Sequence, residues 1–146
     1  MIGINKYKST NVPTLKGAVS DAYSIQQYLE NELNVPKSQI RNLYDAGATR
    51  AAIISAFRQL QSDPRIKPGD PILIYFAGHG GESTSPTSLH TNSKTAFLVP
   101  HDYSTSIDHC PVHGIPYSTI GLLINRIAKT QGNNIVRPSF ITDSVL

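Results

Sequence analysis

The stretch Pro71-Ile72-Leu73-Ile74-Tyr75-Phe76-Ala77-Gly78-His79-Gly80-Gly81 decides the expected fold of this 146-residue chain. Five bulky apolar residues in a row, closed by glycines, predict a strand that is buried on both faces, as in a parallel sheet. Such a strand delivers the residues that follow it to the carboxyl edge of the sheet, where open α/β folds bind their ligands.

The residue delivered to that edge is His79, which lies among Gly78, Gly80 and Gly81. A histidine can titrate near neutral pH and act as a general base, and glycines let a substrate approach the main chain closely. The alternative is that His79 only caps the strand and forms local hydrogen bonds. The strand-end position beside three glycines favours a functional role.

The composition indicates one globular domain, with 39% hydrophobic and 16% charged residues. The net charge is +3, and Lys and Arg are scattered, so we expect no nucleic-acid binding. No apolar stretch approaches membrane-spanning length and the N-terminus does not resemble a secretory leader, so we expect a cytoplasmic protein without membrane contact. The single cysteine, Cys110, excludes an internal disulfide framework and a cysteine-only metal cluster.

The order of elements predicts an α/β fold, a three-layer αβα sandwich with a mostly parallel sheet. Helical spacing of apolar residues predicts helices from Leu15 to Leu33, after the N-cap Thr49, and from Tyr117 or Ser118 to Gln131. The expected strands are a clipped one at Met1–Asn5, Ile40–Tyr44, the central strand, Ala96–Pro100, and one beginning at Asn133 that Arg137-Pro138 breaks. Gly80–Lys94 and His101–Pro116 are expected to be polar loops.

Six segments resemble the caspase-like cysteine peptidases, especially their metacaspase-type branch. They are Gly3-Ile4-Asn5-Lys6-Tyr7, Leu15-Lys16-Gly17-Ala18-Val19-Ser20-Asp21-Ala22, Ala48-Thr49-Arg50, Tyr75-Phe76-Ala77-Gly78-His79-Gly80, Leu98-Val99-Pro100-His101-Asp102 and Gly132-Asn133-Asn134-Ile135. The resemblance implies that residues 1–146 are the N-terminal, histidine-bearing portion of a caspase-like domain. In that interpretation the fold is incomplete at the C-terminus, and the nucleophile loop and the small-subunit portion are missing.

The resemblance also implies a Cys-His dyad that hydrolyses peptide bonds, with His79 assisting a thiolate. The backbone N–H of Gly80 matches one donor of the oxyanion hole. Asp21 matches an acidic residue that lines the pocket for a basic substrate residue. For Asp21 the alternative of a solvated helix residue stays open.

The family's nucleophile has no counterpart in this sequence. Asp143-Ser144 fits the first two positions of the family's motif, but Val145 stands where the cysteine belongs, and Ser144 is a weak nucleophile without an activating base. Tyr117 also departs from the family, which often has an acidic residue after Gly-Ile-Pro. We therefore expect no peptidase activity from this polypeptide alone.

Cys110 is flanked by His109 and lies near His113, a setting that could activate a thiol. A free surface cysteine is the simpler interpretation, because the family places no nucleophile there. The same cluster with His101 and Asp102 lacks a recognised zinc spacing, so no metal site is expected. No cofactor is expected, and the resemblance leaves calcium open without an identifiable site.

Several functions remain open at this point. The first is a cysteine-type endopeptidase domain that carries only the histidine half, with a peptide or protein substrate and association with another caspase-like chain. The second is a catalytically dead pseudo-peptidase that acts as a protein-binding or regulatory module. The third is an incomplete gene product whose last strand is interrupted by Arg137-Pro138. The fourth is a flavodoxin-like nucleotide-binding domain, which is disfavoured because no phosphate-binding glycine loop follows the first strand of this sequence.

Overall fold

The computed structural model describes residues 1–84, 94–132 and 135–145; for Thr84 and 135–145 the description covers the backbone. Three helices and eight strands make up this part of the chain. The helices are α1 (Ala18–Asn31), α2 (Arg50–Ser62) and α3 (Tyr117–Gln131), with short 3₁₀ turns η1 (Lys37–Gln39) and η2 (Asp45–Gly47). The strands are β1 (Ile2–Gly3), β2 (Leu43–Tyr44), β3 (Ile72–Thr84), β4 (Lys94–Leu98), β5 (Ser106–Ile107), β6 (Cys110–Pro111), β7 (Ile115–Pro116) and β8 (Ile135–Val145).

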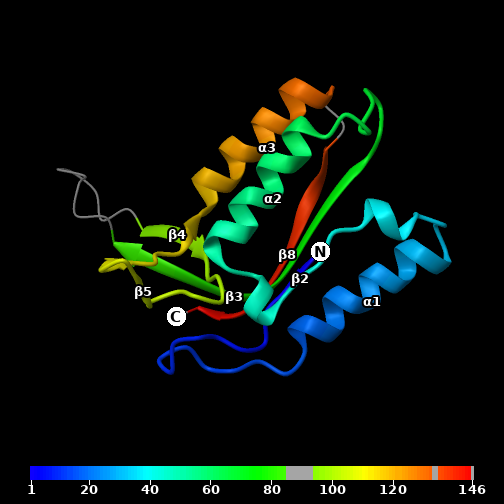
Figure 1. Cartoon of the computed structure of the whole chain (residues 1–146). Coiled ribbons are helices and arrows are strands. Elements are labelled where there is room, and N and C mark those ends of the chain that lie inside the picture. The colour runs from blue at the N-terminus through cyan, green and yellow to red at the C-terminus, as the bar shows by residue number, and fades with distance from the viewer. Residues whose placement is uncertain (85–93, 133–134, 146) are drawn as a thin grey trace.

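The main sheet has the order β2-β1-β3-β4-β7, and β8 pairs with β3. Strands β1, β2, β3 and β8 run parallel, whereas β4 is antiparallel to both β3 and β7. Figure 1 shows α2 and α3 on one side of β3 and β8, and α1 on the other. The structure thus confirms the predicted three-layer α/β fold with a mostly parallel sheet.

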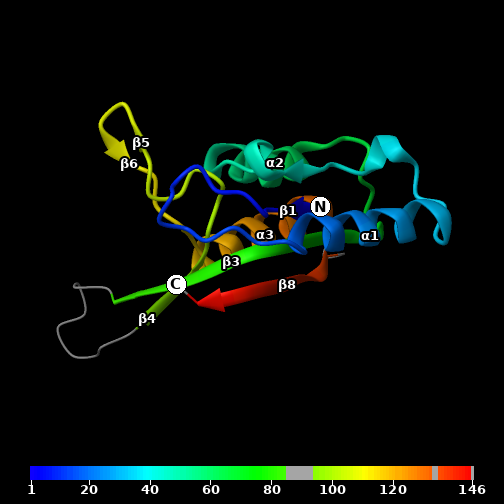
Figure 2. The ribbon, with the colours of Figure 1, turned by 90° about the horizontal axis from the view of Figure 1, so that it is seen from below.

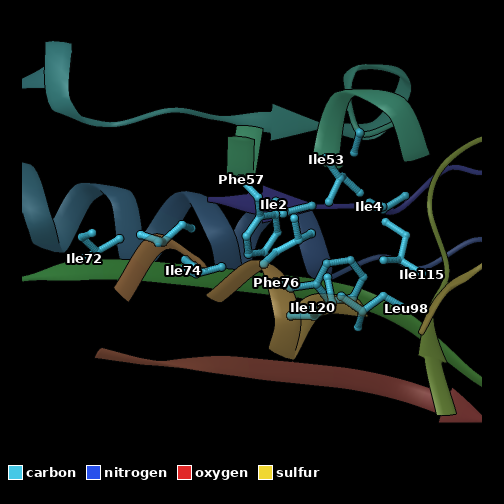
Figure 3. Packing of buried hydrophobic residues seen from close by; sticks show 13 residues of the cluster. Ile2, Ile4, Ile53, Phe57, Ile72, Ile74, Phe76, Leu98, Ile115 and Ile120 are labelled. Carbon is cyan, nitrogen blue, oxygen red and sulfur yellow. The ribbon is translucent and has the colours of Figure 1, made fainter. Parts of the chain in front are cut away.

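The central strand β3 presents apolar side chains to both helical layers, because side chains alternate along a strand. Ile72, Ile74 and Phe76 belong to the main core, and Figure 3 shows Phe57 of α2 and Ile120 of α3 converging with Phe76 beside β3. On the opposite face Tyr75 and Ala77 pack against α1, in a second cluster with Ala18 and Ala22 of that helix. The continuous apolar run of the sequence is therefore explained by burial on both faces.

The three predicted helices are confirmed, but α1 differs at both ends, because it begins at Ala18 rather than at Leu15 and ends at Asn31. The Thr49 hydroxyl accepts a hydrogen bond from the Ala52 N–H at 3.2 Å and caps α2 as expected. Helix α3 begins at Tyr117, and Gly132 follows it in the left-handed conformation, with φ 90°. Leu33, predicted on the inner face of the first helix, lies beyond the end of α1 and is 55% exposed.

Three strand predictions are corrected. The expected strand at Ile40 begins only at Leu43, the first residue that pairs with β1, opposite Ile2. The expected loop after Gly80 is shorter, because β3 continues to Thr84 in antiparallel pairing with β4. That strand begins at Lys94 and ends at Leu98, earlier than predicted. The rest of the loop, 85–93, and the expected start of the last strand at Asn133 and Asn134 lie outside the described residues.

The expected break at Arg137-Pro138 is also wrong, because β8 runs through both residues. The pairs Leu73↔Val136 and Tyr75↔Ser139 leave Arg137 and Pro138 opposite one residue of β3, which is a β-bulge. Proline is tolerated at a bulge because the ladder is already interrupted there. Figure 2 shows β8 running beside β3 and ending near β4. The strand therefore reaches the carboxyl end of β3 despite the proline.

Candidate active site at the carboxyl end of β3

His79 lies inside β3, and its side chain is only 1% exposed. Strand alternation puts it on the face of the sheet that Tyr75 and Ala77 share. The predicted end of the strand before His79 is wrong, because β3 continues to Thr84. His79 does lie beyond the last residue that pairs with β1, since Gly3 pairs with Ala77. The nearly complete burial of the ring is the feature that the sequence did not indicate.

The segment between β1 and α1 contacts His79 at two points. The backbone N–H of His79 donates to the Tyr7 hydroxyl oxygen at 2.8 Å, and the two rings lie 5.2 Å apart at 39°. The ring nitrogen Nε2 lies 2.9 Å from the Pro13 carbonyl oxygen. A carbonyl oxygen can only accept, so Nε2 carries a proton in this contact. In the neutral ring the basic nitrogen is then Nδ1.

Tyr7 and Pro13 were not among the candidate residues in the sequence. Burial, together with the charge of Asp45, raises the pKa of Tyr7 to about 12 despite the hydrogen bond from His79. Tyr7 therefore remains a neutral hydroxyl across the physiological range. Its only signal in the sequence was its place in Gly3-Ile4-Asn5-Lys6-Tyr7, and Pro13 gave none beyond its loop position.

Side chains from neighbouring loops hold this segment over the edge of the sheet. The Asp45 carboxylate accepts from the N–H groups of Asn5 and Lys6 at 2.7 and 2.9 Å. His101 Nδ1 lies 2.7 Å from the Lys6 carbonyl oxygen, and the Asp102 carboxylate accepts from the Arg50 N–H at 2.8 Å. The side chains of His101 and Asp102 thus both hold backbone groups through hydrogen bonds.

The backbone of β8 approaches His79 from the edge of the sheet. Gly80 pairs with Val145 of β8 on one side and with Leu98 of β4 on the other. The register shifts between Gly78↔Thr142 and Gly80↔Val145, so that Asp143 and Ser144 stand opposite His79 alone. Bulges of this kind re-aim side chains and are frequent beside active sites. The side chains of Ser144 and Val145 lie outside the description.

The glycine cluster permits close contacts on both faces of β3. A Cβ atom on Gly81 would lie 2.5 Å from the Phe97 ring, and one on Gly78 would lie 3.1 Å from the Tyr7 hydroxyl. A side chain at position 81 would displace the Phe97 ring, and one at position 78 would press against the Tyr7 hydroxyl. The glycines therefore serve at least the close fit of aromatic rings around His79.

Asp21 lies in the first turn of α1 and is exposed. Its charge contributes, after burial, to the raised pKa of Tyr75 on the same face of the sheet as His79. The carboxylate is open to a cationic ligand, and its role in a substrate pocket stays a prediction.

Cys110 is exposed in the hairpin of β5 and β6, which Figure 2 shows projecting away from β3. Its neighbours Asp108 and His109 form the turn, with φ of 50° and 64°. In the part of the chain that the structure describes, no three His, Cys, Asp or Glu side chains gather as a metal site would require. The same part contains no helix long and apolar enough to cross a bilayer.

The comparisons with known proteins agree with this architecture. The sequence model described as "Caspase domain" matches residues 1–125. Metacaspase-1 of Saccharomyces cerevisiae strain S288c is 29% identical over 111 residues, which cover 72% of this chain and 25% of that protein. Metacaspase-1 of Eremothecium gossypii is 26% identical, over 73% of this chain and 24% of that protein. The chain thus spans about a quarter of the length of these curated relatives.

A solved structure extends the agreement to the fold. Protein GSU0716 from Geobacter sulfurreducens superimposes with a TM-score of 0.68 at 16% sequence identity, over 97% of this chain and 47% of that one. At this identity the likeness concerns the fold alone. The family match ends at residue 125 and so does not include Ser144 or Val145.

Proposed function

This chain belongs to the caspase-domain family of peptidases, and from that premise we propose that it carries the histidine half of a metacaspase-type cysteine endopeptidase site. In the proposed reaction a cysteine thiolate attacks a peptide carbonyl, and the His79 imidazole takes the thiol proton and returns it to the leaving amine. The Gly80 N–H stabilises the oxyanion. Asp21 binds a basic side chain of the peptide.

The register between β3 and β8 is the observation that carries this proposal. It sets the backbone of Val145 beside Gly80, and that of Asp143 and Ser144 opposite His79. A thiol presented from this stretch of β8 would start from a backbone position next to the imidazole. A proton transfer requires such closeness, since the two groups must come within hydrogen-bond reach.

The contact with Pro13 supports the role of His79 as a base. The carbonyl oxygen, 2.9 Å from Nε2, fixes the tautomer with its proton on Nε2. Nδ1 is then the nitrogen that accepts a proton in the neutral ring. When the ring becomes an imidazolium, the same carbonyl continues to accept from Nε2–H and holds the ring in place.

Two features support the view that this chain alone does not cleave peptides. Val145 offers no thiol, and Ser144 would need an activating base. The His79 ring is 1% exposed, so the loop that carries Tyr7 and Pro13 must shift before a substrate reaches it. The proposed partner is another caspase-like chain.

A reintroduced thiol tests the proposal. In a Cys110→Ser background, Val145→Cys should give a thiol whose iodoacetamide alkylation titrates below the ordinary pKa of about 8.5. Adding His79→Ala should return the titration to that value. The matched reference is Cys110 of the unmodified chain, which is exposed and lies in the β5–β6 hairpin. A Val145→Cys thiol whose pKa does not change with His79→Ala would contradict the proposed dyad.

Activity is measured in parallel on peptides that end in arginine, lysine or aspartate. The unmodified chain should not cleave them. Turnover that disappears with His79→Ala would show that a nucleophile exists in this chain after all, and the assignment of position 145 would be wrong.

The buried histidine and the valine at position 145 also favour a second candidate, a pseudo-peptidase that binds peptides without cleaving them. In that case the unmodified chain should bind an arginine-ended peptide in calorimetry, and Asp21→Asn should weaken binding. The thiol pKa of the Val145→Cys variant distinguishes the two candidate functions. The pseudo-peptidase predicts retained binding with an ordinary thiol pKa, and the peptidase site predicts a lowered one.

A further inference from the structure

The loop that joins β1 to α1, residues 4–17, is closed at its base. The Leu15 N–H donates to the Asn5 carbonyl oxygen at 2.8 Å, which brings the two ends of the loop together. The Asn5 side chain accepts from the Val19 N–H, in the first turn of α1, at 3.2 Å. Figure 1 shows the loop as the dark blue segment below the carboxyl end of β3. Asn5 is therefore the base from which the β1–α1 loop extends.

Both contacts that the β1–α1 loop makes with His79 lie between these closed ends. The Tyr7 hydroxyl accepts from the His79 N–H at 2.8 Å, and the Pro13 carbonyl oxygen lies 2.9 Å from Nε2. Beside Pro13, the side chain of Val12 is buried in a cluster with Phe97 of β4. The position of the loop therefore determines where the Pro13 carbonyl meets the imidazole ring.

Asp45 fastens the base of the loop from another part of the chain. Its Oδ1 atom accepts from the N–H groups of Asn5 and Lys6 at 2.7 and 2.9 Å. Hydrogen bonds to a carboxylate are about twice as strong as those between neutral groups. Burial and, after it, the charge of Asp45 raise the pKa of Tyr7 to about 12, so this charge also acts on the residue that contacts His79.

The backbone of Asp45 supports a specific role for its side chain. Asp45 begins η2, on the connection from β2 to α2, and lies 40 residues after Asn5 in the sequence. Its φ is 41°, in the left-handed region that residues other than glycine rarely adopt. Such conformations persist where surrounding contacts fix them, and they cluster at functional sites. The two hydrogen bonds of the carboxylate are contacts of this kind.

We propose that Asp45 is a positioning residue for His79. Its carboxylate fixes the base of the β1–α1 loop, and the loop sets the Pro13 carbonyl against Nε2. That contact holds the ring with its proton on Nε2. A displacement of about 1 Å at a reacting group can cost about a hundredfold in rate. The catalytic consequence rests on the proposed peptidase function, whereas the fixed imidazole is measurable in the unmodified chain.

Nuclear magnetic resonance of the His79 ring tests the proposal. The Nε2–H proton should give a resolved signal, because the ring is 1% exposed and a buried, hydrogen-bonded proton exchanges slowly with water. Asp45→Gly should raise its exchange rate at least about tenfold; glycine is used because it adopts φ 41° without strain. Asp45→Asn should keep the rate within about twofold, because one amide oxygen can accept both N–H groups.

Thr49→Ala is the matched control for a general loss of stability. It removes the hydroxyl that caps α2, on the same connection as Asp45, and leaves the Asp45 carboxylate in place. At a temperature where every variant is folded, Thr49→Ala should not change the Nε2–H exchange rate. If Asp45→Gly does not fold, Asp45→Glu takes its place, because it keeps the charge but moves the carboxylate by one methylene, and it should likewise raise the rate.

Four results would overturn the proposal. The first is an unmodified chain without an Nε2–H signal. The second is a rate that Asp45→Gly, or Asp45→Glu in its place, leaves unchanged. The third is a rate that Asp45→Asn raises as much as that variant does, and the fourth is an equal rise with Thr49→Ala.

The reintroduced thiol connects Asp45 to the proposed reaction. In the Cys110→Ser, Val145→Cys background, Asp45→Gly should move the thiol pKa towards the ordinary value of about 8.5, and Asp45→Asn should not. A thiol pKa that responds to His79→Ala but not to Asp45→Gly would overturn the positioning role. A thiol with an ordinary pKa even when Asp45 is present would contradict only the proposed dyad, because the Nε2–H signal of the unmodified chain decides the role of Asp45.

Discussion

Replacing Tyr7 by phenylalanine tests whether the loop over His79 is fastened as the structure indicates. The substitution keeps the ring but removes the oxygen that accepts the His79 N–H at 2.8 Å. His79 is 1% exposed, so water does not replace this acceptor. A buried donor that loses its partner costs about 1–3 kcal/mol. For a domain of this size the thermal midpoint should fall by about 3–10 °C.

Urea unfolding measures the change, and Tyr23→Phe is the matched control. Tyr23 is 51% exposed, so its variant should stay within about 0.5 kcal/mol of the unmodified protein. Tyr7→Phe should lower the urea midpoint without changing the slope, because the substitution does not change the area of surface that unfolding exposes. Equal stability of the two variants would refute the hydrogen bond to His79 as a fastening contact.

The pH dependence of Tyr7 gives a second readout. Its pKa rises from 10.0 in the unfolded chain to about 12 in the folded protein, because burial disfavours the phenolate. The contribution to stability is thus complete below pH 10 and is lost as the pH rises through 12. Tyr7→Phe should remove this part of the alkaline destabilisation. An unchanged alkaline profile would place Tyr7 in a solvated environment instead.

Three further substitutions probe other parts of the fold. Thr49→Ala removes the hydroxyl that caps α2 and should cost about 1 kcal/mol in urea unfolding; no change would contradict the cap. Gly114→Ala places a Cβ 2.0 Å from the Phe97 ring and should cost about 1–3 kcal/mol, whereas Gly121→Ala in α3, with nothing within 4 Å, should gain up to about 1 kcal/mol.

The sequence alone determined the elements whose signals are local. An uninterrupted apolar run identified β3, because a strand covered on both faces must be apolar at every position. Helical periodicity identified the buried faces of α2 and α3, and Thr49 and Gly132 marked a helix start and a helix end. The likeness to caspase domains was readable for the same reason, since its most specific motif is a continuous piece around His79.

Tertiary structure decided what depends on residues far apart in the chain. Pro13 and Tyr7 lie 66 and 72 residues before His79 in the sequence, so no local pattern predicted their contacts with it. The proline of β8 was expected to end the strand, but pairing with β3 absorbs it in a bulge. The periodicity of apolar residues predicts which face of a helix or strand is buried. The contacts made at that face depend on elements that lie far apart in the sequence, so only the tertiary structure determines them.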